Sequence, residues 1–477
     1  MAIFRQTSNR IHAAVDHDAR VDAFDEAIGA DGAPRPHYAE LLGALARLDL
    51  KSVREALAEG AIAEGATFRV DGVDEDFRLD PVPRLIELEE WAPLAAGLAQ
   101  RVRALDRFVA DIYRDRAIIS EGVVPARAVD TCDHYEPRVA DLPTAPARIG
   151  VAGLDVMRGR DGRFRVLEDN VRTPSGFAYV LAARELLDRR LPAWLADGRV
   201  PFEPAVDMLA RSLRAAAPEA VDDPSIALLT DGRENSAWYE HARLARMLEI
   251  PLVELDDLSV RGGRLMARTG NTHIPLDVVY RRTDEDRLTE AGGELTDVGA
   301  ALIEPLSHGT LSCVNAFGVG IADDKLIHAY VEDMVRFYLG EEPLLRSVRT
   351  YDPCDEARRT EILDRIDELV VKPRSGFGGH GVVVGPHAEP ADVRSAARAL
   401  AERPGDFVAQ ELVTLSTHPT AIEGRLEPRH VDLRPFAFAG DDVEVAPGGI
   451  TRVALDRGAL VVNASQRGGA KDTWVMA

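Results

Sequence analysis

Two apolar runs between residues 369 and 384 flank a glycine-rich loop, and the first run ends at Lys372. Four glycines lie in this loop: Gly376, Gly378, Gly379 and Gly381. Glycines at this density let backbone N–H groups approach a phosphate closely, and the lysine adds a positive charge beside it. The order strand–loop–strand excludes a Walker loop and a dinucleotide fingerprint, which both lead into a helix. The pattern predicts a β-hairpin flap over a triphosphate, although a mobile hairpin with an incidental lysine explains it about as well.

Lysine is rare in this chain. Of the 57 Lys and Arg residues only four are lysines, and they are Lys51, Lys325, Lys372 and Lys471. Where arginine supplies nearly every positive charge, a retained lysine indicates a place that needs a compact ammonium rather than a planar guanidinium. Three of the four lie in stretches that other patterns single out, so we interpret them as functional. Survival by chance is the alternative.

Oxygen donors are expected to meet at the ends of a predicted hairpin. Residues 149–156 form an apolar strand that carries Asp155, and residues 164–167 form a second strand that leads into Glu168 and Asn170. Alternation along a strand places Glu168 and Asn170 on one side, with Asp155 on the neighbouring strand. Carboxylate and amide oxygens suit a Mg²⁺ ion that bridges phosphates. For any one of these residues, an acidic hairpin tip in an acidic protein is the simpler interpretation.

A polar turn follows this hairpin directly and is suited to hold a substrate. It contains Arg172, Ser175 and Gly176.

Residues 225–300 predict a small α/β unit in which the order β-α-β gives a parallel sheet. Its last strand, residues 276–282, ends in Arg281 and Arg282. Open parallel sheets bind ligands at the carboxyl ends of their strands, so both arginines are candidate substrate-binding residues. Pairing with the nearby acidic residues 284 and 285 is the alternative.

The last third of the chain supplies further candidates. Lys325 precedes a predicted helix over residues 326–339, where a lysine opposes the helix dipole and needs another reason to be there. The strand 407–413 is suited to a hinge where adenine lies. Two later strands, residues 430–436 and 448–453, carry one arginine each: Arg434 and Arg452. Residues 461–474 read as a glycine loop without a folded segment after it, which predicts that the terminus docks onto an active site.

Composition limits the classes of function. The chain has 477 residues, is 46% hydrophobic and carries a net charge of −23. It can bury large cores in two or three domains, and its charge argues against nucleic acid or an anionic membrane as partners. Three scattered cysteines and no apolar run of membrane-spanning length fit a cytoplasmic protein. Residues 1–145 read as mostly helical, with helices predicted over 38–57 and 91–112.

Together these motifs resemble the ATP-grasp enzymes, in their circularly permuted bacterial branch. Conventional members, such as bacterial glutathione synthetase, run from a first ATP lysine through a lysine-proline strand with its flap, a hinge and arginine strands. A glycine loop, an aspartate strand and a Glu-x-Asn metal motif follow. Here Asp155 and Glu168-x-Asn170 come before the first element, as a cut after the glycine loop would leave them.

The resemblance implies a fold and a set of domains. The fold class is α/β (α+β), a circularly permuted ATP-grasp core. A mostly helical N-terminal region would span 1–145, and the permuted segment with the metal strands 146–220. A Rossmann-like pre-ATP-grasp domain would span 221–305, and the lid with the rest of the core 306–477.

The resemblance also implies roles for single residues. Lys325 and Lys372 would hold phosphates and, with Arg434 and Arg452, form the catalytic set. The remaining implied ATP-binding residues are Ser375, Gly376, Gly378, Gly379, Gly381, Gln410, Glu411, Val413 and Asn463. Asp155, Glu168 and Asn170 would bind Mg²⁺. Arg172, Ser175, Gly176, Arg281, Arg282 and Lys471 would contact substrate.

One departure from the family's pattern stands out. Members carry Ser-Ser-Gln-Gly-Gly-Gly where this chain has Arg467 in the fourth place. The extra cation puts the nature of the substrate in doubt.

The function that follows is an ATP-dependent carboxylate–amine ligase that works through an acyl phosphate and releases ADP and phosphate. The alternatives are a nucleotide-binding regulator or scaffold without turnover, and an ATP-dependent phosphotransferase. ATP and Mg²⁺ are the expected cofactors, and small-molecule or peptide carboxylates and amines the expected substrates. The family's habit adds helical and transglutaminase-like proteins as partners, with no nucleic acid and no membrane.

Overall fold

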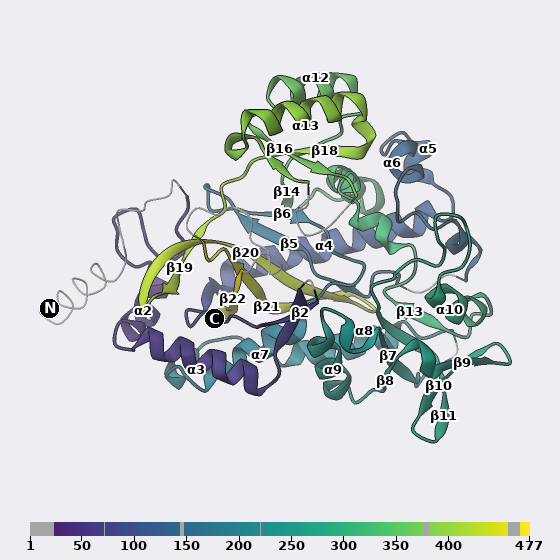
Figure 1. Ribbon diagram of the computed structural model, residues 1–477, viewed down its shortest axis with the longest axis horizontal. Helices are drawn as coiled ribbons and strands as arrows, with labels where there is room; N and C mark the ends of the chain where they lie inside the picture. Colours follow the sequence, from purple (N-terminus) through teal and green to yellow (C-terminus); the bar gives the residue numbers. More distant parts are fainter. Residues whose placement is uncertain (1–22, 71, 144–146, 220, 376–380, 457–467) are drawn as a thin grey trace, which may run out of the picture.

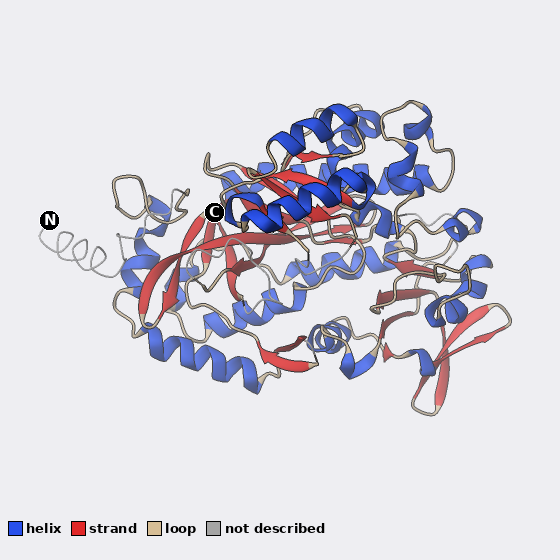
Figure 2. Cartoon of the chain, turned by 45° about the horizontal axis from the view of Figure 1, so that its top comes forward, coloured by secondary structure: helices blue, strands red, loops and turns tan. Residues whose placement is uncertain are grey.

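A computed structural model describes residues 23–70, 72–143, 147–219, 221–375, 381–456 and 468–477. A large twisted sheet runs through the middle of the molecule, and helices cover it (Figures 1 and 2). The described α-helices are α2 (Ala39–Leu45), α3 (Leu50–Ala63), α4 (Leu88–Ile112), α5 (Ala117–Ser120), α6 (Ala126–Asp130), α7 (Phe177–Asp188), α8 (Pro204–Ala215), α9 (Trp238–Met247), α10 (Asp297–Ser307), α11 (Val331–Met334), α12 (Glu356–Asp364) and α13 (Pro390–Glu402).

The central sheet joins strands from both ends of the chain. Its order is β14 (Arg346–Ser347), β6 (Phe164–Glu168), β5 (Asp155–Arg158), β20 (Arg425–Ala439), β21 (Val443–Val453), β22 (Gly469–Met476) and β3 (Arg84–Glu87). Two more strands, β4 (Val151–Ala152) and β19 (Thr417–Ile422), also pair with β20. The strands β5 and β6 form the predicted antiparallel hairpin, with Asp155 opposite Glu168.

Hydrophobic cores lie on both faces of this sheet. On one face α4 buries Leu98, Val102 and Leu105 against sheet residues such as Leu433. On the other face α7 and α8 pack with Trp474 and their neighbours. The predicted helix over 91–112 is therefore confirmed, because its apolar stripe faces the sheet.

The predicted β-α-β unit is also confirmed. The strands β13 (Ser312–Val314), β12 (Val278–Arg282), β7 (Ile226–Thr230) and β8 (Leu252–Val253) form a parallel sheet in that order, and α9 connects β7 to β8. A three-stranded antiparallel sheet extends from this unit at the lower right of Figure 1. Its strands are β9 (Leu258–Arg261), β10 (Arg264–Thr269) and β11 (Thr272–Leu276).

A separate small sheet with two helices forms the top of the molecule in Figure 1. Its order is β15 (Thr350–Tyr351), β18 (Phe407–Glu411), β16 (Leu369–Pro373) and β17 (Val383–Val384). The strands β16 and β17 pair antiparallel, so the predicted hairpin exists. Ile362 of α12 and Leu400 of α13 pack on its apolar face.

Three sequence-based expectations for single elements were wrong. The helix predicted over 38–57 is two helices, because the side chain of Asp49 caps a new helix at α3. Residues 326–339 form a 3₁₀ turn, a short α-helix and a π-helical turn instead of one α-helix. The C-terminal residues are a buried strand, β22, between β21 and β3.

Strands also occur in the region read as mostly helical. They are β1 (Thr67–Val70) and β2 (Val73–Asp76), which pair with each other, and β3 of the central sheet. The division into domains stays a prediction. None of the helices in the described ranges combines the length and apolar character needed to cross a membrane.

Candidate functional site

The strands β5 and β6, which carry predicted metal ligands, lie next to Lys372 of the small sheet. Lys372 is the penultimate residue of β16, and its Nζ lies 3.5 Å from Oε1 of Glu168, the last residue of β6. Asp155 is the strand partner of Glu168. The juxtaposition of the Asp155–Asn170 segment with the lysine hairpin, which the permuted order predicts, is therefore present.

Asp155 lies between two arginines. Arg434 donates to its two carboxylate oxygens at 2.7 and 2.9 Å, and Nη2 of Arg452 lies 2.9 Å from Oδ2. Arg452 also pairs with Asp432, its partner across β20 and β21. Burial opposes the charge on Asp155, but the two guanidiniums outweigh it and hold the pKa of Asp155 below its ordinary value. The two arginines predicted to act together thus share one carboxylate.

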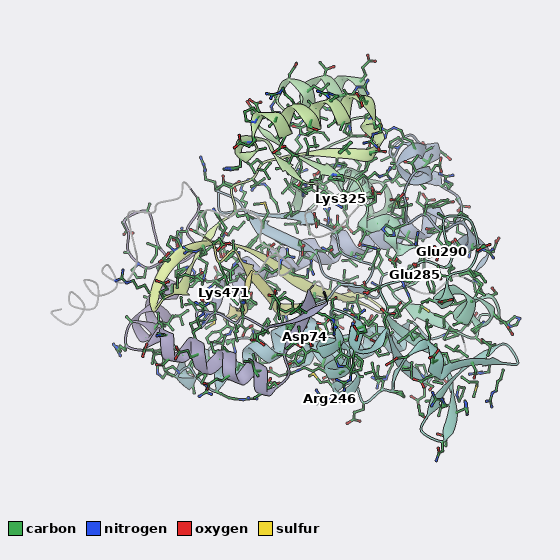
Figure 3. The ribbon with its side chains drawn as sticks, viewed as in Figure 1. Asp74, Arg246, Glu285, Glu290, Lys325 and Lys471 are labelled. Carbon is green, nitrogen blue, oxygen red and sulfur yellow. The ribbon has the colours of Figure 1, made fainter. Side chains whose placement is uncertain are left out.

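Lys325 faces the same space from a different element. It follows a 3₁₀ turn, residues 319–323, and its Nζ donates to the carbonyl of Arg374 at 3.3 Å (Figure 3). Burial lowers the pKa of Lys325, Glu168 raises it and Lys372 lowers it further. Lys325, Lys372 and Glu168 therefore interact electrostatically here, although the elements that carry them are distant in sequence.

The predicted adenine hinge lies on β18, beside the strand of Lys372. Nε2 of Gln410 donates to Oγ1 of Thr350 at 3.0 Å. Glu411 is held by Tyr351 and by Arg365 at 3.1 Å, and Val413 lies just beyond the end of β18.

Part of the predicted phosphate loop lies outside the described residues. The glycines of this loop that lie outside are Gly376, Gly378 and Gly379. Asn463 and Arg467 of the C-terminal glycine loop also lie outside the described residues. Ser375 is exposed at the start of the phosphate loop. Gly381 at its end has φ +72°, a left-handed conformation that favours glycine.

Comparison with known proteins shows to which family the chain belongs. The model of the family "Circularly permuted ATP-grasp type 2" matches residues 83–454. The chain belongs to this family.

Relatives are similar over almost the whole chain. An uncharacterized protein of Mycobacterium tuberculosis (strain ATCC 25618 / H37Rv) is 43% identical over 469 residues, or 96% of this chain and 85% of that protein. An uncharacterized protein of Synechocystis is 40% identical over 467 residues, which are 95% of this chain and 97% of that protein. A Frankia casuarinae protein described as "Putative glutamate--cysteine ligase 2-2" is 41% identical over 461 residues, which are 95% of this chain but only 53% of that protein.

A solved structure shows the same fold. It is a glutathione synthetase-like effector from Globodera pallida in its apo form, with a TM-score of 0.56 at 12% identity, covering 90% of this chain and 98% of that chain. At this identity the likeness concerns the ATP-grasp fold alone.

Two groups that sequence reasoning missed support the ATP-grasp site. Asp169, between the two predicted metal ligands, accepts from Arg101 at 2.6 and 2.7 Å and contacts Nδ1 of His328 at 2.7 Å. Arg374 binds Asp324, the residue before Lys325, at 2.8 and 2.9 Å. A buried arginine on the apolar side of α4 is a signal that could have indicated the first group.

The polar turn after the strands β5 and β6 borders the site, and its role in holding substrate stays a prediction. The carbonyl of Ser175 accepts from Nη1 of Arg434 at 3.3 Å. Arg172 is paired with Asp323 at 2.8 Å and with Asp286 at 3.4 Å. The N–H of Gly176 donates to Glu240, so this turn is anchored to α9.

Three predicted substrate residues have structural partners instead. Lys471 is fully buried in an ion pair with Asp80, apart from Lys325 in Figure 3, because β22 runs inside the sheet. Arg282 is buried against Glu240 at 2.9 Å. Arg281 is buried with its guanidinium over the ring of Phe317.

The donors at the strand ends fit a magnesium ion in part. Asn170 has a buried side-chain Nδ2 without a hydrogen-bond partner, and rotating the amide would present its oxygen there. Glu168 has a 39% exposed side chain. Oδ2 of Asp155 already accepts from both arginines, so this residue has less capacity for a metal. Within the described ranges no group of three or more His, Cys, Asp or Glu could hold a metal, so phosphates and water would complete the shell.

Proposed function

We propose that the protein is an ATP-dependent carboxylate–amine ligase. The observation that carries the proposal is the 3.5 Å contact between Lys372 and Glu168, beside Asp155 and its two arginines. Cations for phosphates and donors for a metal are gathered at one place from opposite ends of the chain. Membership of the ATP-grasp family supports the same interpretation.

Each group has a proposed task that follows from its charge and position. Lys325 and Lys372 would bind phosphate oxygens of ATP, with Gln410 and Val413 beside the adenine. Glu168 and Asn170 would hold magnesium, which when bound neutralises charge on the phosphates. Arg434 lies beside the Ser175 turn, where its guanidinium would stabilise negative charge on the phosphoryl group and the tetrahedral adduct.

The proposed reaction has two displacements. A substrate carboxylate oxygen bonds to the γ-phosphorus of ATP, and the bond to ADP breaks. The amine nitrogen then bonds to the acyl carbon, inorganic phosphate leaves, and the amine's proton passes to solvent. Residues of this site contribute positioning and charge balance, with no covalent intermediate on the protein.

The test is ADP release by the purified protein with Mg²⁺-ATP and pools of carboxylates and amines. Ligation predicts ADP and phosphate in equal amounts only when both substrates are present. Hydroxylamine in place of the amine should trap a hydroxamate from the acyl phosphate.

Two other functions predict different results. A phosphotransferase would yield ADP with a stable phosphorylated product and without free phosphate. A regulator or scaffold would bind nucleotide and release no ADP with any pool. Either outcome would reject the ligase proposal. The Frankia name does not decide among them, because it describes a protein about twice as long as the matched part.

A further inference from the structure

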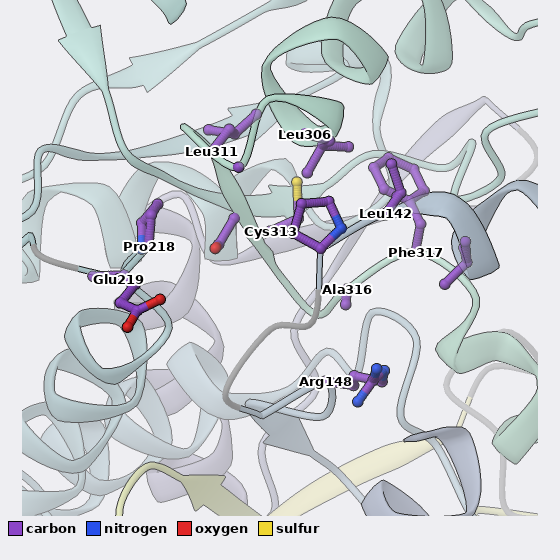
Figure 4. Close-up of a pocket in the computed structure, with 14 residues that line it drawn as sticks. Leu142, Arg148, Pro218, Glu219, Leu306, Leu311, Cys313, Ala316 and Phe317 are labelled. Carbon is purple, nitrogen blue, oxygen red and sulfur yellow. The ribbon is translucent and has the colours of Figure 1, made fainter. Parts of the chain in front are cut away.

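A cavity of about 570 Å³ lies away from the residues assigned to ATP, beside the edge strand β13 of the parallel sheet (Figure 4). Leu142, Leu306, Leu311 and Phe317 supply apolar walls. Cavities of this size with mostly apolar walls and a few polar groups are typical of small-molecule sites.

One wall of the cavity is a buried arginine whose guanidinium makes no direct contact with an acidic group, although the Asp106 carboxylate lies near enough to attract it. Arg148 is only 7% exposed and lines the cavity. Its backbone is fixed, since its N–H donates to Asp106 at 2.7 Å and its carbonyl accepts from Ala316 at 3.0 Å. Among the described residues, however, its guanidinium has no hydrogen bond and no ion pair. A guanidinium that faces a cavity, is mostly withdrawn from water and has no hydrogen bond costs free energy, and an anion in the cavity would recover it.

The surrounding charges limit which anion fits. A second guanidinium, that of Arg281, lies behind Phe317 at 4.3 Å from its ring, and its Nε and Nη1 are buried without partners. At the other end of the cavity the carboxylate of Glu219 is exposed. A single negative charge near Arg148 is therefore favoured, and a second one near Glu219 is opposed.

We propose that this cavity binds an amphiphilic monocarboxylate, with its carboxylate on Arg148 and its hydrocarbon body against Leu142, Leu306 and Leu311. The site is separate from the one proposed for ATP. It also borders β13 and the segment that connects this strand to Lys325, because Cys313 of the strand and Ala316 and Phe317 of the segment line it.

The test is calorimetric titration of the whole chain, without nucleotide, using three eight-carbon probes. Octanoate should bind saturably with one site per chain. Octanol, which lacks the charge, and octanedioate, which adds a second one, should each bind at least about tenfold more weakly. Equal affinity for octanoate and octanol, or no saturable octanoate binding, would reject the proposal. The result is independent of ligase activity, since no ATP is present.

Two variants and one control locate the binding. Arg148→Met should weaken octanoate binding at least about tenfold and leave the melting temperature unchanged or higher, because the guanidinium that it removes makes no hydrogen bond or close ion pair with the described residues. Ala316→Leu fills part of the cavity and should weaken all probes. Arg107→Met, which alters an exposed arginine on α4, should change nothing. Destabilisation by Arg148→Met, or octanoate binding that survives it, would show that the arginine has a structural role instead.

Discussion

Replacing Glu168 by Gln separates catalysis from folding more cleanly than any other change at the ATP-grasp site. The side chain is 39% exposed, and it forms an ion pair with Lys372 at 3.5 Å. Partly exposed ion pairs contribute at most about 1 kcal/mol, so the free energy of unfolding should fall by no more than that. Glutamine keeps the shape and one oxygen but removes the charge that a magnesium ion needs.

The loss of turnover should be much larger than the loss of stability. Removing one group that stabilises transition-state charge costs about 10²–10³ in kcat, and we expect at least this for Glu168→Gln. The substitution also leaves Lys325 and Lys372 without their shared counter-charge. Nucleotide binding without magnesium should therefore become tighter, while stimulation by magnesium disappears.

The assay measures ADP release and nucleotide affinity over a magnesium titration, with urea unfolding alongside. Glu444→Gln is the matched control. Glu444 lies near the start of β21, is 44% exposed and forms an ion pair with Arg211 of α8. Unchanged ADP release in Glu168→Gln would refute the metal assignment. A loss of several kcal/mol in stability would show that the residue is structural.

Three further predictions test neighbouring parts of the argument. Lys372→Arg should lower turnover far more than Lys51→Arg, because a planar guanidinium does not replace a point charge on phosphate oxygens, and equal small losses would remove the significance of the rare lysines. Asp155→Asn should cost about 1–3 kcal/mol in urea unfolding, since it leaves half-buried Arg434 without its carboxylate while Arg452 keeps Asp432, and an equally stable variant would contradict the cluster. Burial, helped by Arg282, lowers the pKa of His241 to about 2. Below about pH 6.5 the unfolded chain therefore binds a proton that the fold excludes, and stability should fall by about 1.4 kcal/mol per pH unit, a slope that His241→Gln should reduce.

The parts of the fold that the sequence predicted have a strong periodic or cyclic signal. The stripe of α4 and the hairpin of Asp155 and Glu168 were predictable because one face of each meets a core. The contact between Glu168 and Lys372 was predictable from the order of the motifs. A circular permutation changes the point at which the chain begins but keeps the cyclic order of its elements. Periodicity alone carries no information on such distant contacts.

The supporting residues were harder to predict, because their role depends on partners from remote elements. Arg101 and His328 hold Asp169 from two different helical segments. Arg281 and Arg282 were misread for a related reason. Their position at the end of β12 is typical of a ligand site. In the fold, however, Glu240 of α9 pairs with Arg282, and the ring of Phe317 packs against Arg281.

The C-terminal strand shows why a fully buried strand with polar residues misleads. Strands buried on both faces lack the alternation that marks a strand, and Lys471 and Asp472 made this one resemble a loop. Each charge has a partner instead: Lys471 binds Asp80, and Asp472 accepts from Arg184 at 3.0 Å. A one-residue slip would leave both charges buried and unpaired, so these pairs specify the register of β22. That register sets Ala470 opposite Arg452 on β21. The lysine predicted to contact substrate thus contributes to the site indirectly, by fixing the strand against which a candidate catalytic arginine is held.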